Sequence, residues 1–585
     1  MILQELHHLY KRLAQNPEID IAEPGFSKEN ISFSITITED GELFDPENPI
    51  SDLRDEELRP QKITVPKFEG KRTSGIKAYF LWDKTDYVLG LKKDPSVKNS
   101  VVEKETPEHH KAFLSLIDDV VHITGLDHPA VKAVQSFCKS EARIQQLRKS
   151  PYWADFLNSF IVFKFVGEAG KNIYEIEKVK KAWKEYLKKA SISDNMEEGI
   201  CLVSGDQDFI AHIHPTIKKG VGGKNDIPLI SCNFDAGESY GRKKNANAPV
   251  STSSASAIAG ALNYLIDTPD HNIKIADTKT LFWAETNDRF ADFFGKALAS
   301  RDDEILSEDV AAFLKSIRSG RMPEEIKDSS RFFVLGLAPN AARVSVRFWY
   351  VDSIENIAKK IGLHFTQLQI VKQRDENQEF PSLWRLIRET ATQHKTENIP
   401  PNIIGPLMRG ILSGSSYPNN ILSILLSRMR VDQDYNQLNY YRASFIKSIL
   451  NRNYHKELTM SLDHNRIAVP YLLGRLFATL EKVQEEASGG NLNTTIKDRY
   501  FASVSTSPRA VFPRLLTLHQ NHLKKLKTEK HGLAVTREKL MGEIISHLPP
   551  DLPGSIRLED QGEFAIGYYH QRQDFFTKKE EVVSE

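Results

Sequence analysis

The chain has 585 residues, a length that predicts two or three hydrophobic cores rather than one. Lysine plus arginine and aspartate plus glutamate both number 78, so the formal net charge is zero, which argues against a uniformly basic protein that coats nucleic acid. Any nucleic-acid site is therefore expected to be a local patch. The three cysteines, Cys138, Cys201 and Cys232, are too few and too scattered for a disulfide framework or a four-thiolate zinc site, which suits a reducing cytoplasm.

The first residues predict an amphipathic helix. Ile2, Leu6, Leu9 and Leu13 fall on one helical face, and charged residues interrupt the run, so we do not expect a secretory signal. No apolar run is long enough to span a membrane. A cytoplasmic location follows as the expectation.

Residues 1–355 predict an α+β body with mixed sheets, because short β-branched or aromatic runs alternate with helical stretches. The expected strands are Ile31 to Ile37, Tyr87 to Leu91, Phe160 to Val166, Phe332 to Leu337 and Val344 to Val351. Glycine and basic residues gather between them at Glu69 to Gly75, Lys218 to Lys224 and Gly237 to Asn247. Long loops of this kind inside a compact domain are usually functional or disordered.

From about residue 380 the strand pattern disappears, and the spacing of apolar residues predicts an all-α C-terminal region. One helical stripe starts at Val469 and ends at Gly489-Gly490, and further helices are expected over 494–504, 508–527, 536–548 and 562–577, separated by Gly532 and by Pro549-Pro550. We therefore predict a body over 1–355, a helical connector over 356–459 and a bundle of about five helices over 460–585.

Recognisable catalytic motifs are absent. Gly220-Val-Gly-Gly-Lys224 has the glycines and a lysine of a phosphate-binding loop, but Asn225 replaces the magnesium-binding hydroxyl and the spacing is wrong. Neither a G-x-S-x-G nucleophile elbow nor H-E-x-x-H occurs. The close histidine pairs, His109-His110 and His212 with His214, lack a carboxylate or cysteine at metal-site spacing. We predict no catalytic residue, metal or cofactor. An active site assembled only in three dimensions would escape this search, so a DNA-processing nuclease is the first alternative. The second alternative is a scaffold that binds no nucleic acid.

The densest basic stretch runs from Lys62 to Lys93 and contains the loop Gly70-Lys71-Arg72-Thr73-Ser74-Gly75, followed by Lys77. Cations neutralise phosphates, and hydroxyls and glycine amides approach the backbone closely. The loop therefore predicts DNA contact, while a solvated surface loop would have the same composition.

Two further segments carry groups of the same chemistry. The loop Glu238 to Ser251 contains Tyr240, Arg242, Lys243, Lys244, Asn245 and Asn247. Asparagine can pair with adenine and tyrosine can stack on a base, but Asn and Pro are also ordinary turn residues. In the segment Leu335 to Trp349, a turn at Pro339-Asn340 leads into a strand where Arg343, Ser345 and Arg347 alternate with Val344, Val346 and Phe348. Asn340, Arg343 and Arg347 are candidates for binding phosphate, and the two arginines could equally pair with acids.

These segments together closely resemble the large-subunit family of the type I-C CRISPR surveillance complex (Cascade), the Csd1 or Cas8c family. The matching signatures are Lys71-Arg-Thr-Ser-Gly-Ile-Lys-Ala-Tyr-Phe80 with Tyr87-Val-Leu-Gly90, Cys201-Leu-Val-Ser-Gly205 with His214-Pro215, Glu238-Ser-Tyr-Gly241 with Asn247-Ala-Pro-Val-Ser251, Gly336-Leu-Ala-Pro-Asn-Ala-Ala-Arg-Val-Ser-Val-Arg-Phe-Trp349, and Glu563-Phe-Ala-Ile-Gly-Tyr568. They occur in order along almost the whole chain.

The resemblance implies a non-catalytic DNA inspector. Such a subunit sits at the 5′ end of the guide RNA beside the backbone and guide-processing subunits, recognises a protospacer-adjacent motif in double-stranded DNA, helps to open the duplex into an R-loop, holds the displaced strand and recruits the helicase-nuclease that degrades the DNA. The protein reads a short motif and base pairing reads the sequence, which is the general logic of RNA-guided recognition.

The resemblance also suggests that the bundle is translated separately from Met460 as the small subunit. Met460 precedes the polar segment Ser461 to Asn465, which is rich in N-cap residues and is expected to open the first helix. Basic residues outnumber acidic ones from there to residue 527, which favours contact with the displaced strand, although helix surfaces are often basic for solubility alone. The basic residues are Arg466, Arg475, Lys482, Lys497, Arg499, Arg509, Arg514, Lys524, Lys525 and Lys527.

Overall fold

The computed structural model of residues 1–585 forms two compact units. It describes residues 1–19, 21–67, 75–94, 96, 102–193, 197–217, 221, 227–232, 235–286, 289–299, 308–321, 323, 329–340, 343–375, 377–432, 437–489 and 492–576. The first unit comprises Met1–Asp267 and Ala341–Val344, and the second comprises Thr268–Asn340 and Ser345–Glu585. The expected boundaries after residues 355 and 459 both lie inside the second unit. Within the described residues, we find no helix with the length and apolar character needed to cross a membrane.

The first unit is built around a four-stranded sheet with the order β3-β2-β8-β5. β2 (Phe33–Ile37) and β8 (Phe160–Phe165) are parallel, while β3 (Ser51–Asp52) and β5 (Trp82–Lys84) pair antiparallel with β2 and β8. Both faces of the sheet are buried. Ile161 and Phe163 pack in the larger core, and Val162 packs with Trp82 and Tyr174 on the other face, because successive strand residues point to opposite sides.

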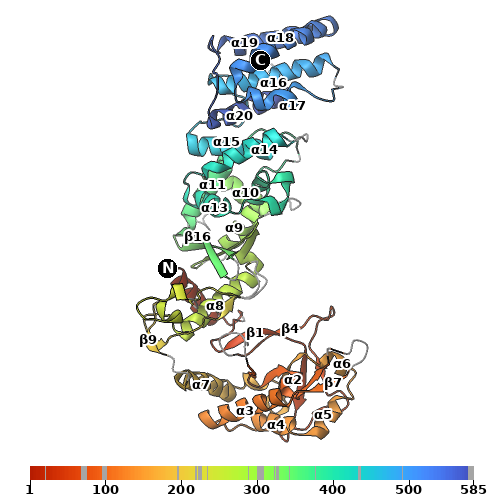
Figure 1. The fold of residues 1–585 in the computed structure, drawn as a ribbon, viewed down its shortest axis with the longest axis vertical. Helices are drawn as coiled ribbons and strands as arrows, with labels where there is room; N and C mark the ends of the chain where they lie inside the picture. Colours follow the sequence, from red (N-terminus) through yellow and green to blue (C-terminus); the bar gives the residue numbers. More distant parts are fainter. Residues whose placement is uncertain are drawn as a thin grey trace. The chain divides into compact units, whose positions relative to one another are not determined.

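Some of the remaining elements of the first unit lie beside this sheet, whereas α1 (Ile2–Gln15) and α8 (Thr252–Asp267) pack against each other (Figure 1). Its other helices are α2 (Thr85–Val88), α3 (Pro107–Thr124), α4 (Pro129–Cys138), α5 (Glu141–Leu147), α6 (Trp153–Phe156) and α7 (Glu177–Ser193). Its other strands pair antiparallel in twos: β1 (Phe26–Ile31) with β4 (Gln61–Pro66), β6 (Leu91–Lys93) with β7 (Glu103–Glu105), β9 (Glu198–Ile200) with β10 (Gln207–Phe209), and β11 (Thr216–Ile217) with β12 (Ile227–Pro228).

Of the four expected elements of this unit, the first helix and the strand from Phe160 are confirmed, and two differ. The amphipathic helix at the start of the chain is α1, with Leu6, Leu9 and Leu13 buried. The expected strand from Ile31 to Ile37 is the end of one strand and the whole of the next, divided at Ser32. The expected strand from Tyr87 to Leu91 is wrong, because its first part lies in the short helix α2, which packs on α3. A short apolar run does not distinguish a buried helix from a buried strand.

The second unit begins with a four-stranded sheet with the order β13-β14-β15-β16 and is helical from residue 354 onward in its described parts. The strands are β13 (Asn272–Ile275), β14 (Thr278–Ala284), β15 (Arg331–Asn340) and β16 (Arg343–Ser353). The last two confirm the expected strands there. The helices before the bundle are α9 (Arg289–Ala299), α10 (Glu308–Arg318), α11 (Ile354–Leu368), α12 (Leu383–Arg388), α13 (Ile404–Ser413), α14 (Asn419–Val431) and α15 (Tyr440–Tyr454).

Five further helices form the C-terminal bundle. They are α16 (Val469–Ala487), α17 (Ile496–Val504), α18 (Pro508–Glu529), α19 (His531–Ser546) and α20 (Leu558–Asp574). The predicted all-α region and its helix positions are thus confirmed, with two corrections. Gly532 lies inside α19, which begins at His531, and α18 ends at Glu529. The polar segment after Met460 does not cap α16, whose N-cap is Ala468; Asp463 instead receives a hydrogen bond from Asn465 and donates its N–H to the Tyr471 hydroxyl.

The helices α16 and α20 cross at very close range because each places a glycine against the backbone of the other. A Cβ atom added at Gly474 would lie 2.1 Å from the Phe564 carbonyl oxygen, and one at Gly567 would lie 2.2 Å from the Tyr471 carbonyl oxygen. On another face of α20, Gly562 lies against Leu422 of α14 and Leu450 of α15. The bundle therefore shares one continuous core with the helices that precede it.

Candidate nucleic-acid interface

The first basic loop emerges from a rigid base in the first unit. The Trp82 indole N–H donates to the Pro66 carbonyl at 2.6 Å, and the Tyr79 ring stacks on Trp82 with 4.5 Å between centroids. The Lys67 N–H donates to the Gly25 carbonyl at 2.9 Å, and its ammonium pairs with Glu29 at 2.6 Å. The chain is thus firmly held on both sides of residues 68–74.

The predicted contacts of this loop divide into two groups. Lys71, Arg72, Thr73 and Ser74 lie outside the described residues, so their contact with DNA stays a prediction. Gly75 and Lys77 are exposed. The Lys77 ammonium has no hydrogen bond or ion pair with any other described residue, so its charge faces solvent and is available to a phosphate.

The second loop presents an aromatic ring beside two cations. Tyr240 is fully exposed, at 101% of its reference area. Arg242 and Lys243 are also exposed, and their side chains have no hydrogen-bond or ion-pair partner within the described residues. Lys244 begins a turn of 3-10 helix, Lys244–Asn247, and its side chain lies outside the described part of the chain.

The two asparagines of this loop hold its backbone rather than face solvent. Asn245 is 2% exposed, and its side-chain carbonyl accepts the Cys232 N–H at 3.0 Å. The side-chain carbonyl of Asn247 accepts the N–H and the hydroxyl of Ser239, both at 3.1 Å, and its amide donates to the Arg242 carbonyl at 2.8 Å. Neither amide is placed to read a base in this conformation. Base reading by these asparagines stays a prediction that would require the loop to rearrange.

The third segment is the hairpin formed by β15 and β16. Asn340, the last residue of β15, and Arg343, the first of β16, are exposed, as a phosphate contact would need. Arg347 donates to Asp277 at 3.1 Å, which is the acid-pairing alternative. The face of β16 that carries the valines is only partly buried, because Phe348 is 2% exposed but Val346 is 44% exposed.

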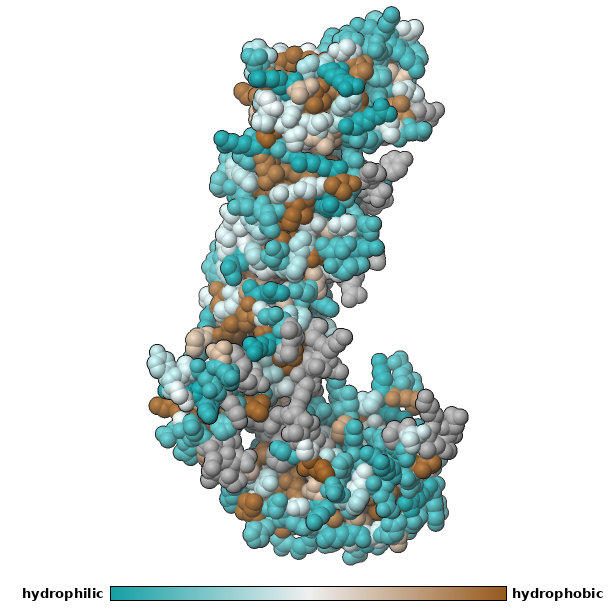
Figure 2. All heavy atoms as spheres, viewed as in Figure 1, coloured by the Kyte–Doolittle hydropathy of each residue, from teal (hydrophilic) through white to brown (hydrophobic). Residues whose placement is uncertain are grey.

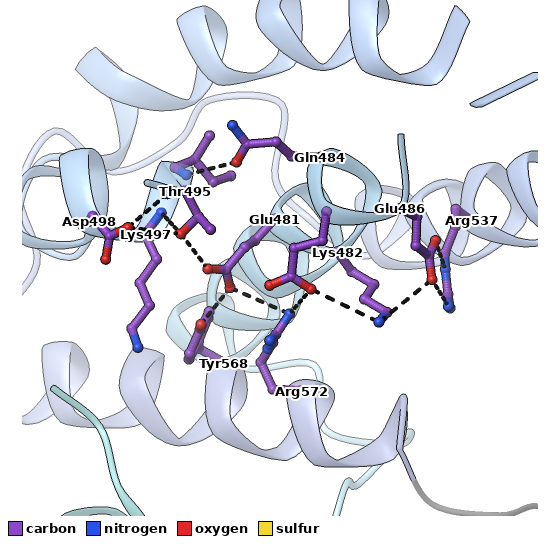
Figure 3. A network of polar contacts seen from close by, with 12 residues as sticks. Glu481, Lys482, Gln484, Glu486, Thr495, Lys497, Asp498, Arg537, Tyr568 and Arg572 are labelled. Carbon is purple, nitrogen blue, oxygen red and sulfur yellow. Dashed lines mark hydrogen bonds and ion pairs between the residues drawn. The ribbon is translucent and has the colours of Figure 1, made fainter. Parts of the chain in front are cut away.

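Acidic residues of α16 form hydrogen bonds and ion pairs with other helices of the bundle. Glu481, 2% exposed, accepts hydrogen bonds from Thr495 at 2.7 Å and Tyr568 at 2.5 Å (Figure 3). Arg572 pairs with Glu485 at 2.8 Å, and Arg537 pairs with Glu486 at 2.8 Å. These contacts join α16 to α17, α19 and α20, so they stabilise the bundle.

The predicted basic surface of the bundle is accordingly reduced. Arg466 pairs with Glu563 at 2.6 Å, Arg475 is 1% exposed, and Lys482 lies within 4 Å of Glu485 and Glu486. Lys525 and Lys527 pair with Glu529 and Glu538. In Figure 3 no dashed line reaches the Lys497 ammonium, and burial lowers the pKa of this lysine.

One face of α18 retains unpaired cations. Arg514, Thr517, Asn521, Lys524 and Thr528 are all exposed and follow the three-and-four spacing of a single helical stripe that contains no acid. Arg514 lies over the Tyr500 ring at 5.8 Å, and Lys524 has no side-chain partner among the described residues. Figure 2 shows mostly hydrophilic side chains at the end of the bundle where α18 and α19 lie.

A comparison with protein-family models identifies one family, described as CRISPR-associated protein (Cas_Csd1), over residues 6–576. The chain belongs to the Csd1 family. A search of curated proteins found no match. The family match spans all the sequence signatures given above, so the resemblance that they indicated is confirmed. This protein is therefore a CRISPR-associated protein.

The first close histidine pair of this Csd1-family chain, His109 and His110, has structural partners. His109 bonds to Asp86 at 3.0 Å, and His110 lies 3.1 Å from the carbonyls of both Tyr87 and Cys138. Among the described residues, no group of three or more histidine, cysteine, aspartate or glutamate side chains has an arrangement that could hold a metal ion.

Sequence reasoning missed the unusual environment of Cys201. Its sulfur accepts the N–H groups of Val203 at 3.4 Å and Ser251 at 3.3 Å and lies 3.5 Å from the Ser254 hydroxyl. Burial raises the pKa of the thiol, but these hydrogen bonds outweigh burial and lower the pKa to about 6. The side chain is 1% exposed, so in this Csd1-family chain the sulfur organises the start of α8.

Proposed function

We propose that this chain is the non-catalytic large subunit of a type I-C Cascade. In this role it lies at the 5′ end of the guide RNA with the backbone and guide-processing subunits, recognises the protospacer-adjacent motif in duplex DNA, promotes unwinding and R-loop formation, and recruits the helicase-nuclease. The observation that carries the proposal is the match of residues 6–576 to a CRISPR-associated family.

The charge distribution supports a local DNA site rather than a uniformly basic surface. In the first unit many cations are already paired, as in the contacts of Lys180 with Glu23 and of Lys132 with Asp127, both at 2.6 Å. Lys77, Arg242 and Lys243 differ, because they are exposed and lack a partner among the described residues. Such cations release condensed counterions when they meet a phosphate, which makes binding salt-dependent.

The test compares two triple variants of the chain in the assembled, guide-loaded complex. In the first, Lys71, Arg72 and Lys77 are all changed to alanine, which should weaken duplex binding. Each lost phosphate contact lowers the log-log salt slope by roughly 0.9, so three contacts correspond to about 2.7. The control changes Lys132, Lys180 and Lys184 to alanine. It removes the same number of positive charges, but from side chains that are already paired with carboxylates. Equal slopes in the two variants would contradict a DNA site at the first loop.

We also propose that the bundle holds the displaced strand through α18. The exposed stripe from Arg514 to Thr528 combines unpaired cations with hydroxyl and amide groups, the chemistry that follows a single-stranded backbone. Changing both Arg514 and Lys524 to alanine should lower the salt slope for single-stranded DNA by about 1.4, at roughly 0.7 per cation. The control changes Lys525 and Lys527 on the same helix, whose charges are already paired, and should leave the slope nearly unchanged.

A separately translated small subunit that begins at Met460 belongs to the same proposal. Met460 is 54% exposed in the irregular segment between α15 and α16, so a chain begun there retains all five bundle helices. It would also lose contacts, because the Met460 carbonyl accepts the Val371 N–H and Lys456 pairs with Asp560 and Glu563 of α20. The face of α20 that packs on α14 and α15 would then need a new partner.

The alternative is a DNA-processing nuclease whose active site sequence motifs do not reveal. We propose no catalytic residue and assign cleavage to the helicase-nuclease partner. Incubation of the chain alone with a labelled duplex, in the presence of magnesium or manganese, distinguishes a nuclease from a non-catalytic DNA inspector. A nuclease would cut the duplex and lose activity when one carboxylate is replaced, whereas a DNA inspector leaves it intact.

A further inference from the structure

The tip of the second loop is a tight turn with a strained tyrosine at its apex. Ser239 and Arg242 pair as an isolated β-bridge, and the Arg242 N–H donates to the Ser239 carbonyl at 3.0 Å. Tyr240 and Gly241 between them have φ values of +53° and +70°. Two consecutive left-handed residues define the turn type that prefers Asn-Gly or Gly-Gly, because a bulky side chain at positive φ is strained.

The turn is held in this shape by one side chain outside it. Asn247 accepts the N–H and hydroxyl of Ser239 on one side of the turn and donates to the Arg242 carbonyl on the other. Asn245 in turn fixes the following 3-10 turn to the Cys232 backbone. Strained backbone persists where the surrounding structure over-determines it, and such positions gather at ligand contacts.

The tyrosine ring packs on none of the residues that the structure describes. At 101% exposure the ring buries no area, and asparagine or glycine would fit the turn with less strain. An exposed aromatic ring on a rigid support is the group on which a nucleic-acid base stacks. The exposed Arg242 and Lys243 follow directly and suit the phosphates of the same strand, whereas Glu238 on the other side of the turn would repel them.

We propose that Tyr240 is a stacking platform for an unpaired DNA base and that Asn247 is its positioning residue. The inference rests on the proposed DNA-inspection function and specifies one contact of it. The unpaired base comes either from the duplex next to the adjacent motif, as it opens, or from the displaced strand. Tyr240 and Asn247 thus have different roles, one touching the base and the other fixing the turn.

The test uses the assembled, guide-loaded complex with three variants. Tyr240→Asn suits the turn and removes the ring, Tyr240→Trp keeps an aromatic group, and Asn247→Ala frees the turn while the tyrosine remains. The probes are a single-stranded DNA and a duplex with a short mismatched bubble beside the adjacent motif, each carrying a fluorescent 2-aminopurine base. Stacking on the ring should quench this base, and the quenched probe identifies which of the two sources supplies it.

We expect Tyr240→Asn to lose the quenching and to weaken binding of the responsive probe by about 5- to 150-fold, the range for one stacked base. Its salt slope should stay unchanged because no charge is removed. Tyr240→Trp should restore both signals, and Asn247→Ala should reduce them but add little to Tyr240→Asn in the double variant.

Wild-type affinity and quenching in Tyr240→Asn would overturn the stacking role, as would a loss that Tyr240→Trp fails to restore. These outcomes differ from a failure of the proposed function. In that case omission of the whole chain from the complex would leave DNA affinity unchanged, whatever residue stands at position 240.

Discussion

Replacing Gly474 with alanine should force α16 and α20 apart. The added Cβ atom would lie 2.1 Å from the Phe564 carbonyl oxygen and 2.7 Å from the Tyr568 nitrogen, both backbone atoms of the facing helix. A carbon atom normally approaches a carbonyl oxygen to about 3.3 Å, so the helices must separate by roughly 1.2 Å. A flexible side chain could move aside, but helical backbone shifts only with its whole helix.

The change in stability caused by Gly474→Ala combines two opposing contributions. Overpacking of a close contact costs about 3 kcal/mol at the upper end of its usual range, and a gap of this size also weakens the dispersion contacts along the crossing. The better helix propensity of alanine returns about 1 kcal/mol. We therefore expect a net loss of about 2 kcal/mol in the stability of the α16–α20 pair.

Hydrogen exchange of the α16 and α20 amides in the full chain measures this loss, since it reports local opening free energies. A loss of about 2 kcal/mol corresponds to roughly 30-fold faster exchange. Gly542→Ala in α19 is the matched control, because no heavy atom lies within 4 Å of its added Cβ, and it should slow exchange in α19. The double variant of Gly474 and Gly567 should cost less than the sum of the single variants, because both disturb one crossing. Unchanged or slower exchange in Gly474→Ala would refute the close crossing.

Two further predictions concern the second unit. Burial lowers the pKa of Lys447 to about 8, below its value near 10.5 in the unfolded chain. The free energy of unfolding is therefore highest above pH 10.5 and falls as the pH drops through 8, because the unfolded chain takes up the proton first. Lys447→Met should therefore raise the urea midpoint at pH 7 and flatten its rise between pH 8 and 10.5, and an unchanged pH profile would contradict this reasoning. Expression of the native gene should yield a second species that begins at Met460, and Met460→Leu should abolish that species while the full chain still folds, because the side chain is 54% exposed. Intact-mass measurement of the purified complex checks this, and a single full-length species from the unaltered gene would refute the internal start.

Sequence reasoning was most successful where one pattern determines one structure. The stripe that starts at Val469 predicted α16 because apolar residues at helical spacing must bury one face. The strands β8, β15 and β16 were found because short runs rich in β-branched and aromatic residues favour strands. It failed at Tyr87 to Leu91, where packing of α2 on α3 decided between helix and strand. The start of α19 was also placed wrongly, because Gly532 lies within this helix instead of separating it from α18.

The candidate site could be predicted by composition but not by role. From the sequence, Tyr240, Asn245 and Asn247 lie in one loop, and all three were predicted to contact DNA. Only the hydrogen bonds distinguish the buried Asn245 and the turn-fixing Asn247 from the exposed ring. Likewise, a count of charges could not separate Arg514 and Lys524 from cations that pair across the bundle, because these pairs join residues far apart in the sequence. The thiol of Cys201 had no sequence signal, since its partners come from two separate segments.

Motif discrimination by the guide-loaded complex with and without this chain tests the central claim most directly. The measurement compares the affinity for duplexes that share one target sequence and differ only in the adjacent motif, at fixed salt, together with the rate at which the target strand pairs with the guide. If the chain inspects DNA, its addition should produce strong preference for one motif and faster pairing on that duplex only. Equal preference with and without the chain would contradict the account.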